Sequence, residues 1–269
     1  MRRFINPTFL KAAIWYWTGK STKDPHFIIG TGRCGSSLLV DVLASNEAVK
    51  TSQFEWYHTF LKTLKRSYAA QDFLTDIIDI EKVSEESVRS WNAFDRFYMK
   101  ALFKYFASYS DKTYIIKSPA ISLILKELQQ LFPKGKFIHL YRNPYAVTLS
   151  VYKKEYFRVE RYREVYTETE FKAVAANYWN SSMKGVEDFL NSIDKETFLE
   201  FSYEEFTKDA RKKTAEIAGF LNISNNFSYD FSTIRSTNYK IENLSTEEVK
   251  MLNPIFREMM EKKNYEPIH

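Results

Sequence analysis

Residues 26–39 have the sequence His26-Phe27-Ile28-Ile29-Gly30-Thr31-Gly32-Arg33-Cys34-Gly35-Ser36-Ser37-Leu38-Leu39. The apolar start of this stretch is typical of a strand, and it leads into three glycines within six residues. Two serines then begin an apolar run with helical periodicity. Glycine frees backbone N–H groups to point at a ligand, and a helix N-terminus adds donors and a favourable dipole. The stretch therefore predicts a strand, an anion-binding loop and a helix.

The spacing of this loop is close to that of the P-loop of nucleoside triphosphatases, with Gly30, four residues, Gly35 and then Ser37. Ser36 stands where a P-loop has its lysine, and the cation has moved to Arg33. The loop therefore predicts a nucleotide-like anion other than ATP with magnesium.

Composition sets broad bounds on the class of protein. The chain has 269 residues, of which 44% are hydrophobic and 17% aromatic, so it can bury a large core. Its net charge of +5 suits an anionic ligand, whereas a dedicated nucleic-acid binder usually carries a denser basic stripe. The single cysteine excludes an internal disulfide framework, and we expect a cytoplasmic protein. No linker divides the chain, so we expect one domain over residues 1–269.

The first 25 residues form a predicted helical extension. Their apolar run, residues 9–17, is interrupted by Lys11 and is far shorter than the roughly 20 residues that span a bilayer. A short amphipathic helix packed on the domain is the first interpretation. Peripheral contact with a membrane surface through Trp15 and Trp17 is the alternative.

Strands and helices alternate along most of the chain, which predicts an α/β fold with a central parallel sheet flanked by helices. The expected strands are 26–31, 49–54, 113–117, 136–141 and 197–202. The expected helices are 36–45, 121–132, 144–156, 169–190, 204–221 and 245–264. Residues 56–110, rich in aromatic side chains, are expected to form a helical insertion or cap after the second strand.

A second anion site is predicted at the end of strand 136–141. Arg142 follows this strand, Asn143 is a suitable N-cap, and Pro144 suits the first position of a helix. Ser150 then lies about two turns into that helix. A guanidinium and a hydroxyl in this arrangement can hold one phosphate, although a capped corner with Arg142 paired to a carboxylate is the structural alternative.

These motifs resemble those of sulfotransferases that use 3′-phosphoadenosine 5′-phosphosulfate (PAPS). The loop from Gly30 to Leu39 is similar to that family's 5′-phosphosulfate loop, and Arg142 with Ser150 is similar to its 3′-phosphate site. The strand and lysine at 114–119 and the segment 201–206, followed by a helix, resemble two further family elements in the same order. The resemblance runs over about residues 26–221 and implies a P-loop-like sulfotransferase fold.

The resemblance also implies a cofactor and residue roles. PAPS is the expected donor, adenosine 3′,5′-bisphosphate (PAP) the product, and the family needs no metal for the transfer. Loop residues Gly30, Thr31, Gly32, Arg33, Cys34, Gly35, Ser36 and Ser37 are expected to hold the phosphosulfate, with Arg142 and Ser150 on the 3′-phosphate and Tyr203 on the adenine side. Lys117 is the expected stabiliser of the leaving oxygen, and Arg33 assists it. Apart from this role, Cys34 is expected to be a small residue that fills a tight loop, and a reactive thiol near the helix N-terminus is the alternative.

The general base is predicted from the branch of the family. Ser118-Pro119-Ala120 lacks the histidine that follows the strand lysine in the cytosolic small-molecule branch. Branches that act on carbohydrate or protein acceptors use a glutamate after the second strand, which makes Glu55 the expected base and His58 the runner-up. The resemblance thus implies a hydroxyl or amine group as the acceptor of the sulfuryl group. A glutamate base favours carbohydrate or lipid-linked acceptors over small phenols.

Three weaker signals and two alternative functions remain. The basic residues of 153–163 interleave with aromatic rings and suit either an anionic acceptor or a solvated face. Residues 235–240 lie where the family often closes over the nucleotide, but their sequence matches that pattern poorly. His139, inside an apolar strand, is expected to be a core residue.

Two alternatives to a sulfotransferase are kept for the function of the whole chain. One is a P-loop ATP-dependent phosphotransferase, and the other is a non-catalytic nucleotide-binding module.

Overall fold

A computed structural model describes residues 7–52, 92–118, 121, 122 and 124–269. Five strands form one parallel sheet: β1 (His26–Ile29), β2 (Val49–Thr51), β3 (Thr113–Lys117), β4 (Phe137–Tyr141) and β5 (Phe198–Ser202). Their order is β2-β3-β1-β4-β5, so β1 lies in the centre between β3 and β4. The predicted α/β class and all five predicted strands are confirmed.

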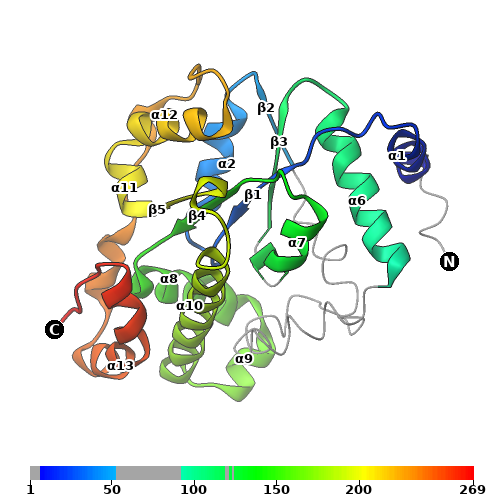
Figure 1. The fold of residues 1–269 in the computed structure, drawn as a ribbon. Coiled ribbons are helices and arrows are strands. Elements are labelled where there is room, and N and C mark those ends of the chain that lie inside the picture. Colours follow the sequence, from blue (N-terminus) through cyan, green and yellow to red (C-terminus); the bar gives the residue numbers. More distant parts are fainter. Residues whose placement is uncertain (1–6, 53–91, 119–120, 123) are drawn as a thin grey trace.

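Helices cover both faces of this sheet (Figure 1). Their bounds are α1 (Pro7–Trp17), α2 (Ser36–Ala44), α6 (Ala93–Ser108), α7 (Leu125–Leu131), α8 (Pro144–Val151), α9 (Glu160–Val165), α10 (Glu168–Leu190), α11 (Tyr203–Lys208), α12 (Ala210–Leu221) and α13 (Thr246–Lys262). A π-helical turn, Tyr152–Tyr156, follows α8 directly, and short 3₁₀ segments precede β5 and α13.

Alternate side chains of the strands enter two separate apolar cores, because successive residues of a strand point to opposite faces. Phe27 and Ile29 of β1 pack with α7, α8, α10 and α13, whereas Ile28 packs with α2 and α12 on the other face. Both cores are dense with fully buried aromatic rings, among them Trp179 and Phe206. Burial on both faces explains why β1, β3 and β4, the three inner strands, are nearly continuous apolar runs.

Several predicted bounds were wrong for local reasons. β1 ends at Ile29 because Gly30 adopts φ +139°, outside the strand region. Predicted helix 204–221 is two helices, since Asp209 leaves helical geometry with φ −147° and ψ 76° and its side chain caps α12. Predicted helix 144–156 is α-helical only to Val151. Predicted helix 121–132 begins at Leu125.

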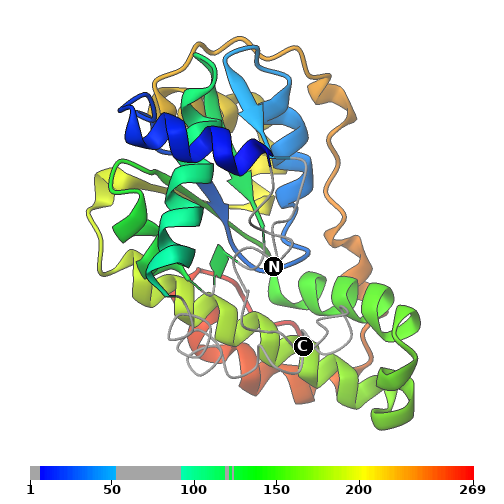
Figure 2. The same ribbon diagram turned by 90° about the vertical axis from the view of Figure 1, so that its right-hand side faces the viewer.

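Helices α1 and α6, which belong to the predicted N-terminal extension and the predicted insertion, pack against each other. Figure 2 shows α1, in dark blue, lying against α6, in green. Phe9 of α1 and Tyr98 of α6 have ring centroids 4.5 Å apart, and Trp15 lies 5.1 Å from Tyr105. The predicted helix in the extension is therefore confirmed over residues 7–17. Of the predicted insertion 56–110, α6 lies in the described part, and residues 56–91 lie outside it.

Candidate functional site

The loop after β1 is shaped by residues with positive φ. Gly30, Arg33 and Gly35 have φ of +139°, +68° and +98°. A Cβ atom on Gly30 would lie 2.3 Å from the carbonyl oxygen of Leu140, so β4 approaches too closely for any side chain there. Arg33 holds a left-handed backbone conformation that residues other than glycine rarely adopt. Non-glycine residues in this conformation cluster at functional sites. The predicted strand, loop and helix are all present, since Ser36 begins α2.

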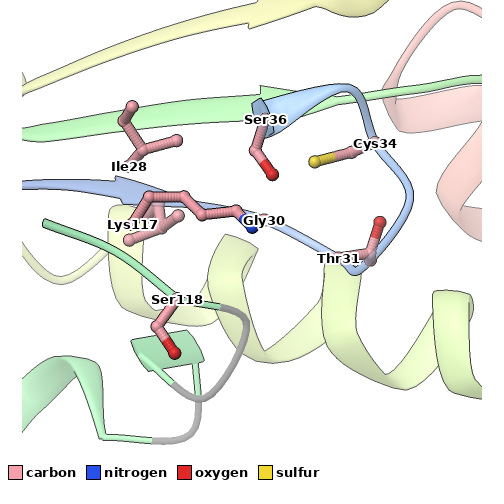
Figure 3. A pocket seen from close by; sticks show the side chains of 8 residues that line it. Ile28, Gly30, Thr31, Cys34, Ser36, Lys117 and Ser118 are labelled. Carbon is pink, nitrogen blue, oxygen red and sulfur yellow. The ribbon is translucent and has the colours of Figure 1, made fainter. Parts of the chain in front are cut away.

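A pocket opens between this loop and the end of β3. It is lined by Ile28, Ile29, Gly30, Thr31, Cys34, Ser36, Lys117 and Ser118. In Figure 3 the Lys117 side chain extends from β3 toward Gly30, and Ser36 projects from the start of α2 into the same region. The parallel register explains this meeting, because Lys117 pairs with Ile28, two residues before Gly30. The carboxyl ends of adjacent parallel strands are where ligands bind in such sheets.

The chemistry of this pocket suits an oxyanion. Thr31 is 2% exposed, and its Oγ1 atom has no hydrogen-bond partner among the described residues. A buried hydroxyl without a partner is costly, and a ligand that accepts from it removes the cost. Ser36 and Ser37 supply further hydroxyls at the first two positions of α2, where the helix dipole favours negative charge.

Cys34 lies in the same loop, but its environment makes it unreactive. The thiol is 1% exposed, and burial raises its pKa, an effect larger than the opposing hydrogen bonds from Ser36 and the charge of Lys117. A protonated, buried thiol behaves as a small apolar group. Cys34 thus lines the pocket as a filler of the tight loop.

The second predicted anion site lies beside the first. Asn143 caps α8, with its side chain accepting from the N–H groups of Tyr145 and Ala146, and Pro144 follows as the first helical residue. Arg33 Nε donates to Ser150 Oγ at 3.1 Å, and an Arg142 terminal nitrogen donates to the Arg33 carbonyl at 3.3 Å. The structure therefore joins the loop motif to the 142–150 motif through two hydrogen bonds.

Arg142 is almost buried, with 7% of its surface exposed, and burial lowers its pKa. Its Nε donates to Asn238 Oδ1 at 2.9 Å and its other terminal nitrogen to Thr237 Oγ1 at 2.7 Å. Asn238 in turn donates to Glu204, which also accepts from the Asn143 amide at 3.1 Å. Within the described ranges its direct partners are neutral oxygens, so no carboxylate there pairs directly with the guanidinium. The structural alternative of a simple pair with a surface carboxylate is not what the described residues form.

Tyr203 joins the loop to Arg142. The Arg142 guanidinium lies 4.4 Å from the centre of its ring, and a Cβ atom on Gly35 would lie 2.4 Å from a ring carbon. The Tyr203 hydroxyl donates to the carbonyl of Arg235 at 3.1 Å. The ring is 4% exposed. Tyr203 is therefore a packing partner of both anion motifs, and its contact with an adenine remains a prediction.

Three residues that hold the loop or Arg142 in place were not predicted individually from the sequence. Tyr178 of α10 is buried, and its hydroxyl accepts the Gly32 N–H at 2.6 Å, so that amide is already paired. Thr237 and Asn238 hold Arg142, although only their general position within 235–240 was indicated. Tyr178, Thr237 and Asn238 are distant in sequence from the loop and from Arg142. No local sequence pattern predicts that they contact the site. Two predicted bases, Glu55 and His58, lie outside the described residues.

His139 and the cationic segment after α8 stand apart from the pocket lining. His139 is fully buried, and its Nδ1 lies 2.6 Å from a Glu200 carboxylate oxygen, as expected for a core histidine. Lys153 and Lys154 of the π-helical turn are exposed. In the described part of the chain, no group of three or more His, Cys, Asp or Glu side chains is placed to hold a metal ion.

Comparison with known proteins gives concordant results. A family model described as the sulfotransferase family matches residues 25–227. Two curated relatives, both named omega-hydroxy-beta-dihydromenaquinone-9 sulfotransferase Stf3, come from Mycobacterium bovis and Mycobacterium tuberculosis. Each is 24% identical over 236 residues, which cover 69% of this chain and 59% of the relative. The chain thus spans well under two thirds of the length of these relatives.

Solved structures share the fold. Sulfotransferase STF9 from Mycobacterium avium aligns with a TM-score of 0.59 at 16% identity, covering 94% of this chain and 81% of that one. The sulfotransferase domain of the curacin biosynthetic pathway aligns at 0.57 and 16%, covering 92% and 100%. Mouse sulfotransferase SULT7A1 in complex with PAP aligns at 0.54 and 14%, covering 90% and 86%.

Proposed function

The chain belongs to the sulfotransferase family, and we propose that it moves a sulfuryl group from PAPS to a hydroxyl or amine group of an acceptor. The observation that carries this proposal is the meeting of two anion motifs. Arg33 bonds to Ser150 at 3.1 Å and to Arg142 through its carbonyl, beside a glycine loop and the strand-end Lys117. Two neighbouring cationic sites suit a nucleotide with phosphate groups at both ends of its ribose.

The residues of the site fit this donor. The buried hydroxyl of Thr31, which has no partner among the described residues, and the serines that start α2 supply donors for the phosphosulfate. Arg142 and Ser150 supply a guanidinium and a hydroxyl for the 3′-phosphate. PAPS supplies an activated sulfuryl group, so the protein's task is to bind, orient and stabilise charge.

The proposed transfer assigns one role to each group. The acceptor oxygen or nitrogen forms a bond to sulfur while the bond from sulfur to the 5′-phosphate oxygen breaks, and that oxygen keeps the electron pair. Lys117, which lines the pocket, stabilises the charge that grows on the leaving oxygen. A base takes the acceptor proton, and Glu55 is the proposed base. No metal ion takes part in this proposal.

The acceptor class is proposed from the sequence branch and from the relatives. The expected Glu55 base favours carbohydrate or lipid-linked acceptors. The Mycobacterium relatives are named for a hydroxylated menaquinone, which is an isoprenoid lipid alcohol. We therefore favour a hydroxyl on a long apolar molecule, in a cytoplasmic setting.

Two measurements on the purified chain test this proposal. The first compares thermal stabilisation by PAP with that by ATP plus magnesium. A ligand at a hundred times its dissociation constant stabilises a folded protein by about 2.7 kcal/mol, or roughly 5–10 °C in this size range. PAP is expected to give this shift. A shift with ATP plus magnesium but none with PAP overturns the proposal in favour of a phosphotransferase.

The second measurement follows transfer of labelled sulfate from PAPS to a long-chain primary alcohol, a simple glycoside and a phenol. Labelled product is expected with the alcohol or the glycoside. PAP binding without turnover of PAPS on any acceptor or in buffer indicates a nucleotide-binding module and contradicts the enzymatic proposal. Lys117→Ala serves as the low-activity reference, and Lys126→Ala, an exposed lysine of α7, is its matched control.

A further inference from the structure

The positive charge of this chain is concentrated at its N-terminal end. Lys and Arg number 39 in the whole chain and Asp and Glu 34. Residues 1–23 hold five of the basic residues, Arg2, Arg3, Lys11, Lys20 and Lys23, and no acidic residue. The rest of the chain is therefore electrically balanced, and the net charge of +5 belongs to this short segment.

The same segment exposes an apolar helix face. Leu10, Ile14 and Trp17 of α1 are 63%, 53% and 81% exposed. They are spaced four and three residues apart, which places them on one side of the helix. The opposite side carries Phe9 and Ala12, which are 8% and 0% exposed and pack toward α6. The outward stripe is thus largely exposed, although the Trp17 ring also lies 6.2 Å from the ring of Phe97 of α6.

Cations and aromatic rings border this stripe. Lys11 and Lys20 are exposed, and Lys20 Nζ lies 6.0 Å from the Trp15 ring. Tyr109 at the end of α6 is 58% exposed, lies 5.9 Å from Trp15, and has Lys50 Nζ 5.6 Å from its ring. In membrane-bound proteins, the boundary between lipid headgroups and acyl chains favours aromatic rings and lysines. Exposed aliphatic side chains between them enter the acyl region.

We propose that α1 is a docking surface for the face of an anionic lipid bilayer. The segment holds no acidic residue, and although Lys23 pairs with Asp111 at 3.8 Å, the exposed Lys11 and Lys20 keep it complementary to acidic headgroups. A second copy of the same surface would bring like charges together, and one short helix stripe is small for a stable dimer interface. No helix of the described residues is long and apolar enough to cross a membrane. Docking at the surface uses only the outward stripe and its lysines.

This surface is firmly attached to the domain that carries the pocket. α1 packs on α6 through several ring pairs, and α6 packs against β3, which ends at Lys117 (Figure 2). Asp24, directly after the basic segment, is buried and paired with Lys104 of α6 at 2.7 Å. A bilayer bound at α1 would therefore fix the orientation of the whole domain. The inference concerns lipid binding alone and stands apart from the proposed transfer reaction.

The test is co-sedimentation of the full chain with large vesicles. Vesicles of phosphatidylcholine with one quarter phosphatidylglycerol are compared with vesicles of phosphatidylcholine alone, at 0.05 M and 0.5 M salt. The chain is expected to bind the anionic vesicles at least tenfold more tightly, with most of this preference lost at high salt, because exposed charges are screened.

Variants separate α1 from the rest of the surface. Ile14→Ser with Trp17→Ser removes the stripe, and Lys11→Glu with Lys20→Glu reverses two charges, each worth about fivefold near an acidic surface. Both double variants are expected to bind at least tenfold more weakly. Val165→Ser of α9 is the matched control, since Val165 is 57% exposed far along the chain, and its binding is expected to be unchanged.

Three outcomes overturn the proposal. The first is equal binding of the chain to neutral and anionic vesicles. The second is undiminished vesicle binding by both double variants of α1. The third is a dimer of the unaltered chain, seen by sedimentation, that is lost when Ile14 and Trp17 are substituted. Melting curves of each variant establish that it is folded. The substituted side chains are exposed, so the melting temperatures are expected to stay within a few degrees of the parent.

Discussion

The Nε atom of Arg33 lies 3.1 Å from the Oγ atom of Ser150, 117 residues away in the sequence. One residue belongs to the loop after β1 and the other to α8, so each anion motif contributes a group to the other. Arg142 strengthens the link by donating to the Arg33 carbonyl at 3.3 Å. The two predicted halves of the nucleotide site therefore form one connected structure.

Arg142→Ala is expected to weaken PAP binding about 10- to 100-fold. A charge-assisted hydrogen bond contributes about 1.5–3 kcal/mol, and the guanidinium is the proposed partner of the 3′-phosphate. Titration calorimetry with PAP and with adenosine 5′-phosphate checks this, since the second ligand lacks the 3′-phosphate and is expected to lose little affinity. Arg257→Ala, an exposed arginine of α13, is the control. Equal losses for both ligands would contradict the assignment.

Lys117→Ala is expected to lower kcat about 10²- to 10³-fold while the affinity for PAP changes less than about threefold. Removing one donor that faces developing charge costs about 3–4 kcal/mol in the transition state, and the product nucleotide lacks the transferring group. Steady-state kinetics and PAP titration on the same preparation check the separation. An unchanged kcat with weakened PAP binding would make Lys117 a binding residue instead of a catalytic one.

Local sequence predicted the parts of the site that local chemistry determines. Glycine is needed at position 30 because a Cβ atom there would lie 2.3 Å from the carbonyl oxygen of Leu140 in β4. Asn143 caps the N-terminus of α8, and Pro144 is its first residue. The contacts of Tyr178 and Asn238 could not be predicted, because they depend on how α10 and the segment after α12 pack against the loop. The break at Asp209 was also missed, since the apolar period continues through it. Glu55 stays a prediction.

Gly32→Ala tests the role of Tyr178 in shaping the loop. A Cβ atom at position 32 would lie 2.9 Å from the Tyr178 hydroxyl but 3.8 Å from the nearest ring carbon. The substitution is therefore expected to destabilise the parent by about 1–3 kcal/mol. In a Tyr178→Phe background the clash disappears, so the same substitution is expected to cost much less.

Urea unfolding of the four proteins in this cycle measures the coupling. Tyr178→Phe alone is expected to cost about 1–3 kcal/mol, because the partly buried Gly32 amide loses its acceptor. Tyr16→Phe, on the surface helix α1, gives the cost of losing a hydroxyl elsewhere. Additive effects of Gly32→Ala and Tyr178→Phe would show that the loop relaxes away from Tyr178.

Glu200 links the acid stability of the fold to a buried polar cluster. Burial opposes its ionisation, but hydrogen bonds and charges from His139 and Lys263 outweigh burial and lower the pKa of Glu200 to about 2. Lys263 Nζ lies 2.9 Å from both carboxylate oxygens and 2.5 Å from Glu187. Since the unfolded chain has the ordinary value of about 4.5, the ionised carboxylate stabilises the fold fully above pH 4.5.

This contribution is lost as the pH falls from about 4.5 toward 2, because the unfolded chain binds the proton first. Glu200→Gln is expected to lower the free energy of unfolding at pH 7 and to leave a smaller acid-dependent loss, by on the order of 2–3 kcal/mol over that window. Urea unfolding at pH 7, 4.5 and 3 measures the difference. Glu164→Gln, an exposed carboxyl of α9, is expected to follow the parent at each pH. Parallel curves for the parent and Glu200→Gln would mean that Glu200 keeps its proton affinity on folding, and the cluster would then contribute no pH dependence.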